Sequence, residues 1–129
     1  MSENIEIGLS KIGQIAVNVH DIERAVEFYR DKLGMKHIFT VPNMAFFDCD
    51  GINLMLAIPV KPEFDHPSSI IYFLVDDIER VYQTLVTRGV KFDSEPCLIA
   101  RMDTYDLWLA AFRDSENNLL ELMSRVTHV

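Results

Sequence analysis

Glu121 is a carboxylate whose place in the sequence could support catalysis or ligand binding. It lies in residues 119–124, where Leu120 and Leu122 alternate with Glu121 and Met123, the pattern of a strand with two different faces. A carboxylate on a partly buried face is costly unless it is paired or hydrogen-bonded, and burial alone raises its pKa. Glu121 is therefore either a general base with a raised pKa or a hydrogen-bonded group that anchors a ligand or the structure.

The cysteines and one linker histidine offer weaker signals. Cys49 and Cys97 are far apart in the sequence and form no C-x-x-C motif, so we expect two buried, reduced thiols. His66 lies in residues 59–69, where several prolines interrupt any strand pattern. We expect His66 to lie on the surface of a linker rather than to bind a ligand.

The elements that would position Glu121 belong to a duplicated unit. Val-His-Asp-Ile-Glu-Arg in residues 19–24 returns as Val-Asp-Asp-Ile-Glu-Arg in residues 75–80. Each copy follows an alternating apolar segment and leads into apolar positions spaced i, i+3, i+4, i+7, which predicts one buried helix face. An aspartate stands where it can cap each helix start, and a glycine stands where a left-handed residue can end each helix. We infer an internal duplication of a strand–helix unit.

Three strand candidates follow each strand–helix unit, so we predict an α+β fold of two βαβββ modules in one domain. Pro42-Asn43 is a turn signal, and Asp50-Gly51 favours a tight hairpin. The expected helices are residues 22–33 and 78–88, and the expected strands are residues 11–19, 35–41, 44–49, 52–58, 69–75, 96–103, 106–113 and 119–124. The expected divisions are an N-terminal arm in residues 1–10, modules in residues 11–58 and 69–125, and a linker in residues 59–68.

Composition limits the classes of partner. The chain has 129 residues, 49% of them hydrophobic, and a formal net charge of −8. A core of this size needs no disulfide, and the acidic balance argues against nucleic acid as a partner. The N-terminus lacks the features of a secretory signal, and no apolar run reaches membrane-spanning length. We expect a cytoplasmic protein without membrane contact.

Three segments resemble the vicinal oxygen chelate superfamily, which includes glyoxalase I, bleomycin-resistance proteins and extradiol dioxygenases. The first is I-x-x-I-x-V-x-V-x-D-I-x-x-A-x-x-F-Y-x-x-x-L-G in residues 12–34, the second is its copy in residues 71–89, and the third is F-x-D…N-x-L-E-L in residues 112–122. The resemblance implies two curved sheets that form a U-shaped trough with the helices outside. It also implies a homodimer, with the trough either within one chain or across the interface.

Metal-dependent members of this superfamily have four ligand positions, which the resemblance places at Gln14, Met55, Ile70 and Glu121. Catalytic zinc typically uses three protein ligands, and non-haem iron uses two histidines and a carboxylate. Only Gln14 and Glu121 could bind zinc, nickel or iron here, so we expect no intact metal site and no cofactor. We expect the Gln14 amide instead to donate a hydrogen bond to Glu121.

The predicted trough face is largely apolar with a few polar groups, as small-molecule pockets are. The alternative is that these side chains simply fill the trough. The facing of residues 106–113 is ambiguous from alternation, and His37 and Arg101 could also reach in from strands. The candidate ligand-binding residues are Gln14, Asn18, Asn53, Met55, Ile70, Tyr72, Leu74, Trp108, Glu121 and Met123.

Three functions fit this trough. The first is non-catalytic binding of a small, largely hydrophobic molecule, as the resemblance to bleomycin-resistance proteins implies. The second is a lyase, isomerase or epimerase similar to glyoxalase I, with Glu121 as the base or a metal ligand. The third is an extradiol dioxygenase, for which Gln14 and Ile70 replace two iron-ligand positions.

Overall fold

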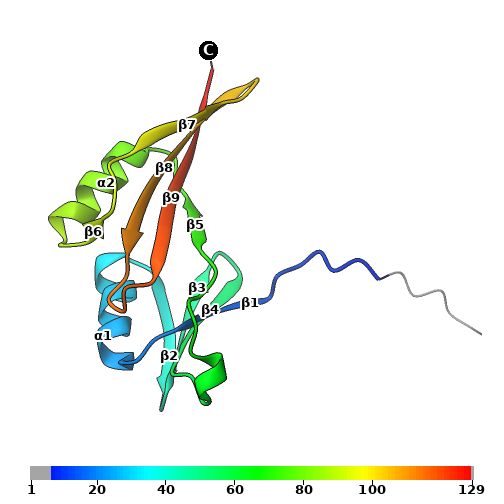
Figure 1. The fold of residues 1–129 in the computed structure, drawn as a ribbon, viewed down its shortest axis with the longest axis vertical. Coiled ribbons are helices and arrows are strands. Elements are labelled where there is room, and N and C mark those ends of the chain that lie inside the picture. Colours follow the sequence, from blue (N-terminus) through cyan, green and yellow to red (C-terminus); the bar gives the residue numbers. More distant parts are fainter. Residues whose placement is uncertain (1–6, 129) are drawn as a thin grey trace, which may run out of the picture.

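The computed structural model describes residues 7–128, and it contains two β-sheets and two principal helices (Figure 1). Part of the expected N-terminal arm, residues 1–6, lies outside the described residues. The order of strands in the first sheet is β1 (Gln14–Asn18), β4 (Ile52–Ala57), β3 (Met44–Cys49) and β2 (Lys36–Val41). In this sheet β1 is parallel to β4, and the other neighbours are antiparallel.

The second sheet repeats this arrangement. Its first strand is parallel to its last, and β6 and β7 pair with different parts of β8. Its strands are β5 (Ile71–Leu74), β9 (Leu119–Thr127), β8 (Tyr105–Arg113), β6 (Lys91–Phe92) and β7 (Cys97–Arg101). The predicted α+β fold of two βαβββ modules is confirmed.

The helices begin where the sequence predicts. The Asp21 carboxylate accepts a hydrogen bond from the backbone N–H of Arg24 at 3.0 Å, and Asp77 accepts one from Arg80 at 3.1 Å. These side chains satisfy N–H groups that have no partner within the first helical turn. The helices they cap are α1 (Ile22–Glu27) and α2 (Ile78–Thr87).

The predicted turns also form as expected. Gly34 and Gly89 have φ angles of 72° and 87°, the left-handed conformation that ends a helix. Asp50 and Gly51 have φ angles of 51° and 91°, and Asn43 has a φ of 69°. Positive φ at both central residues is the geometry of the tight hairpin that joins β3 to β4.

The hydrophobic core lies between the sheets and the helices. Figure 1 shows α1 and α2 on the same side of the molecule, with the strands beside them. We call the surface of each sheet turned away from these helices its trough face. The most deeply buried side chains between the sheets and the helices include Tyr29, Phe47, Leu54, Leu56, Phe112 and Leu120.

The first helix differs from its prediction. Residues 22–33 were expected to form one α-helix, but Phe28–Lys32 form a π-helical turn, in which Leu33 N donates to Phe28 O at 3.0 Å. This wider turn occurs where two adjacent aromatic side chains, Phe28 and Tyr29, are both buried. A π-bulge inside a helix is frequently found at functional positions.

Three further elements depart from the sequence prediction. The short strand β6 was not predicted, because two residues carry no measurable alternation. The linker contains a 3₁₀ turn, Pro62–Phe64. The last strand continues beyond its predicted end because β9 pairs with β8 up to the contact between Tyr105 and Thr127.

Candidate functional site

The first sheet presents the expected polar and apolar groups on its trough face. Leu54 and Leu56 of β4 are buried against the helix, so the alternating Asn53 and Met55 turn to the other side. Gln14 lies beside Asn53 in the parallel register of β1 and β4. The structure therefore brings Gln14, Asn53 and Met55 together.

The second sheet positions Glu121 in the same way. Leu122 of β9 is buried against the core, and the alternating Glu121 and Met123 lie on the trough face. The parallel register places Tyr72 beside Glu121 and Leu74 beside Met123. These four residues form one continuous patch of the second sheet.

Both trough faces are largely apolar and open to solvent within a single chain. Phe39 is 48% exposed, Tyr72 is 46% exposed and Leu74 is 59% exposed. Phe39 stacks on Phe46 of the neighbouring strand, with ring centroids 4.6 Å apart. Exposed apolar patches of this kind mark binding surfaces. Other exposed apolar side chains on these faces are Val41, Met44 and Ile70.

Trp108 does not lie on the trough face, contrary to the expectation. Phe112 of β8 is fully buried against the helix side, and Trp108 has the same alternation and packs against that core. Its register partner Ser124 is fully buried too. Leu107 and Leu109 therefore take the trough side of β8.

His37 and Arg101 do not reach the trough either. The His37 ring lies 5.2 Å from the buried ring of Phe47, on the helix side of the first sheet. Arg101 forms an ion pair with Asp106 at 3.6 Å, and Asp106 shares its side of β8 with Trp108. Both β2 and β7 contain a register shift. Because a bulge changes which side of the sheet the following residues face, simple alternation could not place His37 and Arg101.

Gln14 does not contact Glu121. The Gln14 amide nitrogen lies 3.8 Å from the Met55 sulfur, and no hydrogen bond links it to Glu121 among the described residues. The expectation that Gln14 donates to Glu121 within one chain is therefore wrong. The reason is that the two side chains belong to different sheets, whose trough faces do not meet inside the chain.

The residues at the four family ligand positions do not fit a catalytic metal centre. Isoleucine has no donor atom and a methionine thioether is a poor ligand for zinc, which leaves only the oxygens of Gln14 and Glu121. Within residues 7–128, no group of three or more His, Cys, Asp and Glu side chains is arranged to hold an ion. The donor set falls short of the three protein ligands that catalytic zinc typically uses.

Burial raises the pKa of the Glu121 carboxyl, and repulsion from the Asp93 carboxylate raises it further. Asp93 is itself held by Arg113, whose guanidinium lies 2.8 Å away. Glu121 accepts no hydrogen bond from residues 7–128, so no described residue compensates its desolvation. A carboxyl group in this state can accept a proton from a ligand or hydrogen-bond to it.

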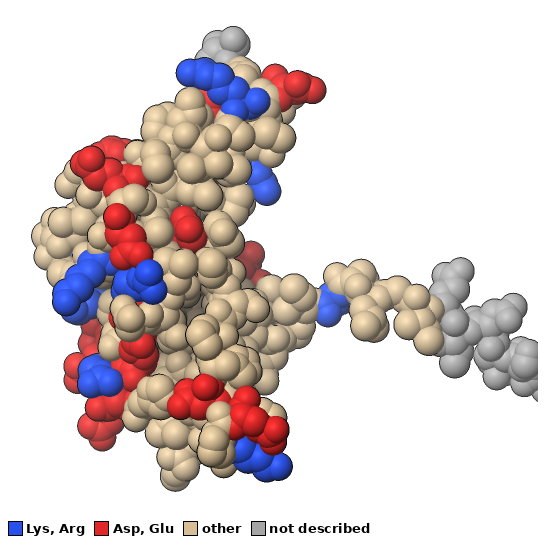
Figure 2. All heavy atoms as spheres, in the orientation of Figure 1, with Lys and Arg blue, Asp and Glu red and all other residues tan. Residues whose placement is uncertain are grey.

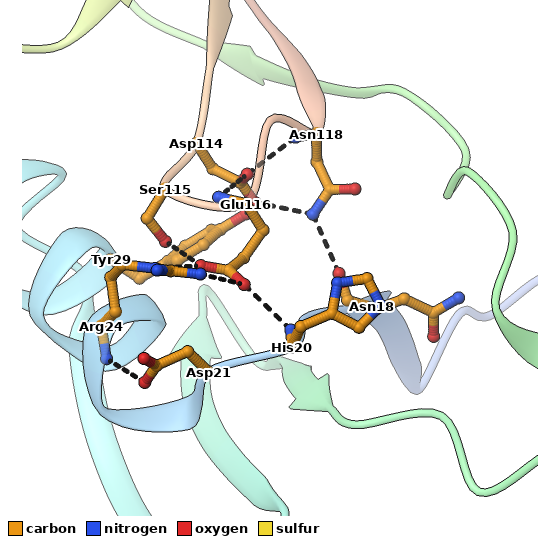
Figure 3. A network of polar contacts seen from close by, with 9 residues as sticks. All are labelled: Asn18, His20, Asp21, Arg24, Tyr29, Asp114, Ser115, Glu116 and Asn118. Carbon is orange, nitrogen blue, oxygen red and sulfur yellow. Dashed lines mark hydrogen bonds and ion pairs between the residues drawn. The ribbon is translucent and has the colours of Figure 1, made fainter.

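A network of polar side chains joins the two modules at the turn between β8 and β9 (Figure 3). Glu116, in the turn between β8 and β9, accepts hydrogen bonds from the Arg24 guanidinium at 2.7 and 3.0 Å and from the backbone N–H of His20 at 2.9 Å. Burial by itself would raise the pKa of Glu116, but the hydrogen bonds from Arg24, His20 and Ser115 lower it to about 2. The first helix is therefore clamped onto the second sheet.

Asp114 is the buried centre of this network. It accepts a hydrogen bond from the Tyr29 hydroxyl at 2.7 Å, two from the backbone N–H groups of Glu116 and Asn118 at 2.8 Å, and one from the Asn118 amide at 2.9 Å. Burial and the nearby carboxylate raise the pKa of Tyr29 well above its usual value. Tyr29 therefore remains a neutral donor to Asp114.

Asn18 and His20 fasten the linker to the end of β1. The Asn18 side-chain nitrogen donates to the carbonyl oxygens of Phe64 at 2.6 Å and His66 at 3.0 Å. The His20 ring lies 3.0 Å from the Asp65 carboxylate. Asn18 was expected to orient a ligand, but its donor group is used to hold the linker.

A polar recess lies at the junction between the modules and the linker. Its volume is about 560 Å³. It is bounded by Asn18 at the end of the first trough face and by Ile70 and Leu119 at the start of the second, so it adjoins both faces. Sequence reasoning did not identify this recess, although Asp114 and Asn118 lie inside the F-x-D…N-x-L-E-L segment. The polar residues of that segment are the sequence signal from which the recess could have been identified.

Charged side chains of both signs lie on the surface. Figure 2 shows carboxylates scattered over the visible face, with basic side chains in small groups among them. The formal net charge is −8.

No helix in the described part of the chain is long and apolar enough to cross a membrane.

Two βαβββ modules with paired trough faces define the class of protein, and comparison with known proteins agrees. The sequence profile of the Glyoxalase/Bleomycin resistance protein/Dioxygenase superfamily matches residues 11–122, so the chain belongs to this superfamily. The protein YraH of Bacillus subtilis is 27% identical over 126 residues, which cover 87% of this chain and 96% of YraH.

Solved structures share the fold at lower sequence identity. A glyoxalase/bleomycin resistance protein/dioxygenase from Nocardioides superposes with a TM-score of 0.76 at 21% identity, covering 95% of this chain and 87% of that chain. TnmS3, an antibiotic binding protein from Streptomyces, superposes with a TM-score of 0.74 at 20% identity, covering 93% of this chain and 99% of TnmS3. At these identities the likeness concerns the fold alone.

Proposed function

We propose that the protein is a cytoplasmic homodimer that binds a small, largely hydrophobic molecule in a trough built from two copies of the chain, without a metal or cofactor. The observation that carries this proposal is the pair of apolar trough faces, which a single chain leaves open around Phe39, Tyr72 and Leu74. Burying apolar surface contributes roughly 25 cal/mol per Å², so faces of this kind favour association and ligand binding.

The second copy supplies the missing wall of the trough. The first sheet of one chain faces the second sheet of its partner, so that Met55 of one copy and Met123 of the other line the same space. This arrangement would also bring Gln14 toward Glu121, which one chain keeps apart. The antibiotic-binding protein TnmS3 shares the fold, which supports small-molecule binding as the class of function. Cys49 is partly buried and Cys97 is exposed, so the expectation of two buried thiols is wrong, but both thiols are unpaired, which suits a reducing compartment.

A complementation experiment tests this arrangement. Met55→Asp places a charge on the first trough face, and Met123→Asp places one on the second. Binding is followed with the apolar fluorescent probe N-phenyl-1-naphthylamine, and dimerisation by light scattering after size-exclusion chromatography. Val86→Asp, on the exposed side of α2, is the matched control.

Each trough variant alone should lose probe binding, while the Val86 variant keeps it. When the two trough variants are mixed and allowed to exchange subunits, about a quarter of the troughs combine two unaltered faces, and binding returns in that proportion. Failure of binding to return, with dimers present, would place the trough within one chain. A protein that stays monomeric at high concentration would refute the shared trough.

A second candidate function is a lyase or isomerase in which Glu121 acts as the base. The raised pKa of Glu121 favours it, since burial and Asp93 hold this carboxyl closer to the range of a general base. Glu121→Gln would abolish turnover of an α-hydroxycarbonyl or hemithioacetal substrate. Calorimetric titration with zinc and nickel completes the test, because micromolar binding would contradict the metal-free proposal.

A further inference from the structure

We propose that the recess at the module junction selects a protonated amine, so that the ligand of the trough has an ammonium head group and an apolar body. This inference rests on the proposed function, because it assigns the polar end of the same ligand. The recess adjoins the trough faces through Ile70 and Leu119, and its volume of about 560 Å³ exceeds that of a head group alone. A ligand could therefore place its head there and its apolar body along the sheets.

The amide donors of the recess are already used inside the protein. The Asn18 side-chain nitrogen donates to two backbone carbonyl oxygens, at 2.6 and 3.0 Å. The Asn118 side-chain nitrogen donates to the carbonyl oxygen of Asn18 and to the Asp114 carboxylate, both at 2.9 Å. All four partners can only accept, so the orientation of both amides is determined. The side-chain oxygen of each asparagine is consequently the group that can still interact with a ligand.

Those two amide oxygens have no partner in the described part of the chain. Neither accepts a hydrogen bond from residues 7–128, and neither is a buried unsatisfied atom, so both reach solvent. Figure 3 shows the side-chain oxygen of Asn118 pointing away from the hydrogen bonds that its side-chain nitrogen makes. In the recess, the side-chain oxygens of Asn18 and Asn118 can therefore accept hydrogen bonds from a ligand, whereas their nitrogens already donate within the protein.

The charged groups lead to the same conclusion. Arg113 lines the recess, but its guanidinium is used on Asp93 at 2.8 Å and on the Asn117 carbonyl at 3.4 Å. Glu116 is neutralised by Arg24, at 2.7 Å. Asp65 uses one oxygen on the His20 ring and leaves the other free. The carboxylate of Asp65 is thus the charge that remains for a ligand.

His66 adds a further acceptor. Its Nδ1 lies 3.1 Å from the carbonyl oxygen of Pro67, which can only accept, so Nδ1 carries the proton in this contact. In the neutral ring Nε2 is then an acceptor. An ammonium group has three donors and no acceptor, which matches a recess that combines two amide oxygens, a free carboxylate oxygen and an imidazole nitrogen.

Three probes with a phenyl group on a short alkyl chain and different head groups test the preference: 4-phenylbutylamine, 4-phenylbutan-1-ol and 4-phenylbutanoate. Dissociation constants are measured by NMR on the ¹⁵N-labelled protein, with the side-chain amides of Asn18 and Asn118 as local reporters. A hydrogen bond to a charged group is stronger than one between neutral groups, so the amine should bind at least about tenfold tighter than the alcohol. The butanoate should bind no better than the alcohol.

Asp65→Asn removes the charge of the recess and keeps an oxygen that can accept from His20. It should reduce the affinity for the amine at least threefold and leave the affinity for the alcohol unchanged. Asp50→Asn, in the hairpin turn between β3 and β4, makes the same change in net charge away from the recess and is the matched control. An equal effect of both variants would mean that net charge alone attracts the amine, and would overturn the assignment.

The outcomes separate this inference from the proposed function. Equal affinities for the amine and the alcohol, with shifts on the trough methionines, would refute the head-group assignment and leave the hydrophobic trough intact. Binding of the amine with no shift at the Asn18 and Asn118 amides would also refute it. If none of the three probes binds, the proposed function fails and the inference fails with it.

Discussion

Replacing Glu116 with glutamine should weaken the clamp between the two modules in a pH-dependent way. The Glu116 side chain is only 2% exposed, and its pKa is lowered from 4.5 to about 2, chiefly by Arg24 and the His20 N–H against the opposing effect of burial. A carboxyl whose pKa is lower in the folded state stabilises the protein above its unfolded pKa. That contribution is lost as the pH falls from 4.5 toward 2.

The size of the effect follows from the pKa difference. A lowering from 4.5 to about 2 corresponds to at most about 3 kcal/mol at neutral pH. Arg24 is 57% exposed, so solvent screens the pair and the realistic loss is about 1–2 kcal/mol. Glu116→Gln should therefore lower the free energy of unfolding by this amount at pH 7, and the gap to the original protein should close as the pH approaches 2.

Urea unfolding at several pH values measures this gap, with the fluorescence of Trp108 as the probe. Trp108 is the single tryptophan and packs against the core, so its emission reports global unfolding. Glu63→Gln, an exposed linker substitution with the same charge change, is the control and should have little effect. A gap below about 0.3 kcal/mol at pH 7, or one that stays constant down to pH 2, would refute the reasoning.

Three further substitutions give expected outcomes. Tyr29→Phe removes a hydrogen bond to the buried Asp114 and should cost about 1–3 kcal/mol in urea unfolding, and a neutral result would mean that water replaces the hydroxyl. Asp77→Ala removes the cap of α2 and should cost about 1 kcal/mol, with a matching loss of helical circular dichroism. The pKa of Glu121 is raised, so its charged form is the destabilised one above pH 4.5. Glu121→Gln should therefore raise the Tm at pH 7, and this gain should disappear at lower pH; an unchanged Tm at pH 7 would contradict the burial of this group.

Much of the fold could be predicted because its signals are local. The capping aspartates Asp21 and Asp77, the hairpin turn at Asp50-Gly51 and the apolar helix stripes each act over a few residues. Because the strand–helix unit is duplicated, the capping aspartate and apolar helix stripe of the first module could be compared with their copies in the second. Trp108 could not be placed, because its neighbours Leu107 and Leu109 are apolar too and alternation distinguishes no face.

The clamp and the recess depend on tertiary contacts that no local pattern contains. Tyr29 meets Asp114, and Asn18 meets Asn118, only because the turn between β8 and β9 packs against the first module. The sequence predicted that Asn18 binds a ligand only because it lies on the side of its strand opposite Val17 and Val19. The structure places it on that side. The structure adds that its nitrogen donates to the linker, so the side-chain oxygen is the group that remains for a ligand.

Methionine methyl NMR during titration with N-phenyl-1-naphthylamine tests the central proposal most directly. Met55 lies on the first trough face and Met123 on the second, whereas Met35 packs against the core on the helix side. The account predicts that the Met55 and Met123 methyl signals shift together with one dissociation constant while the Met35 signal stays in place. A shift confined to Met35, or none at saturating probe, would contradict a ligand trough between the two sheets.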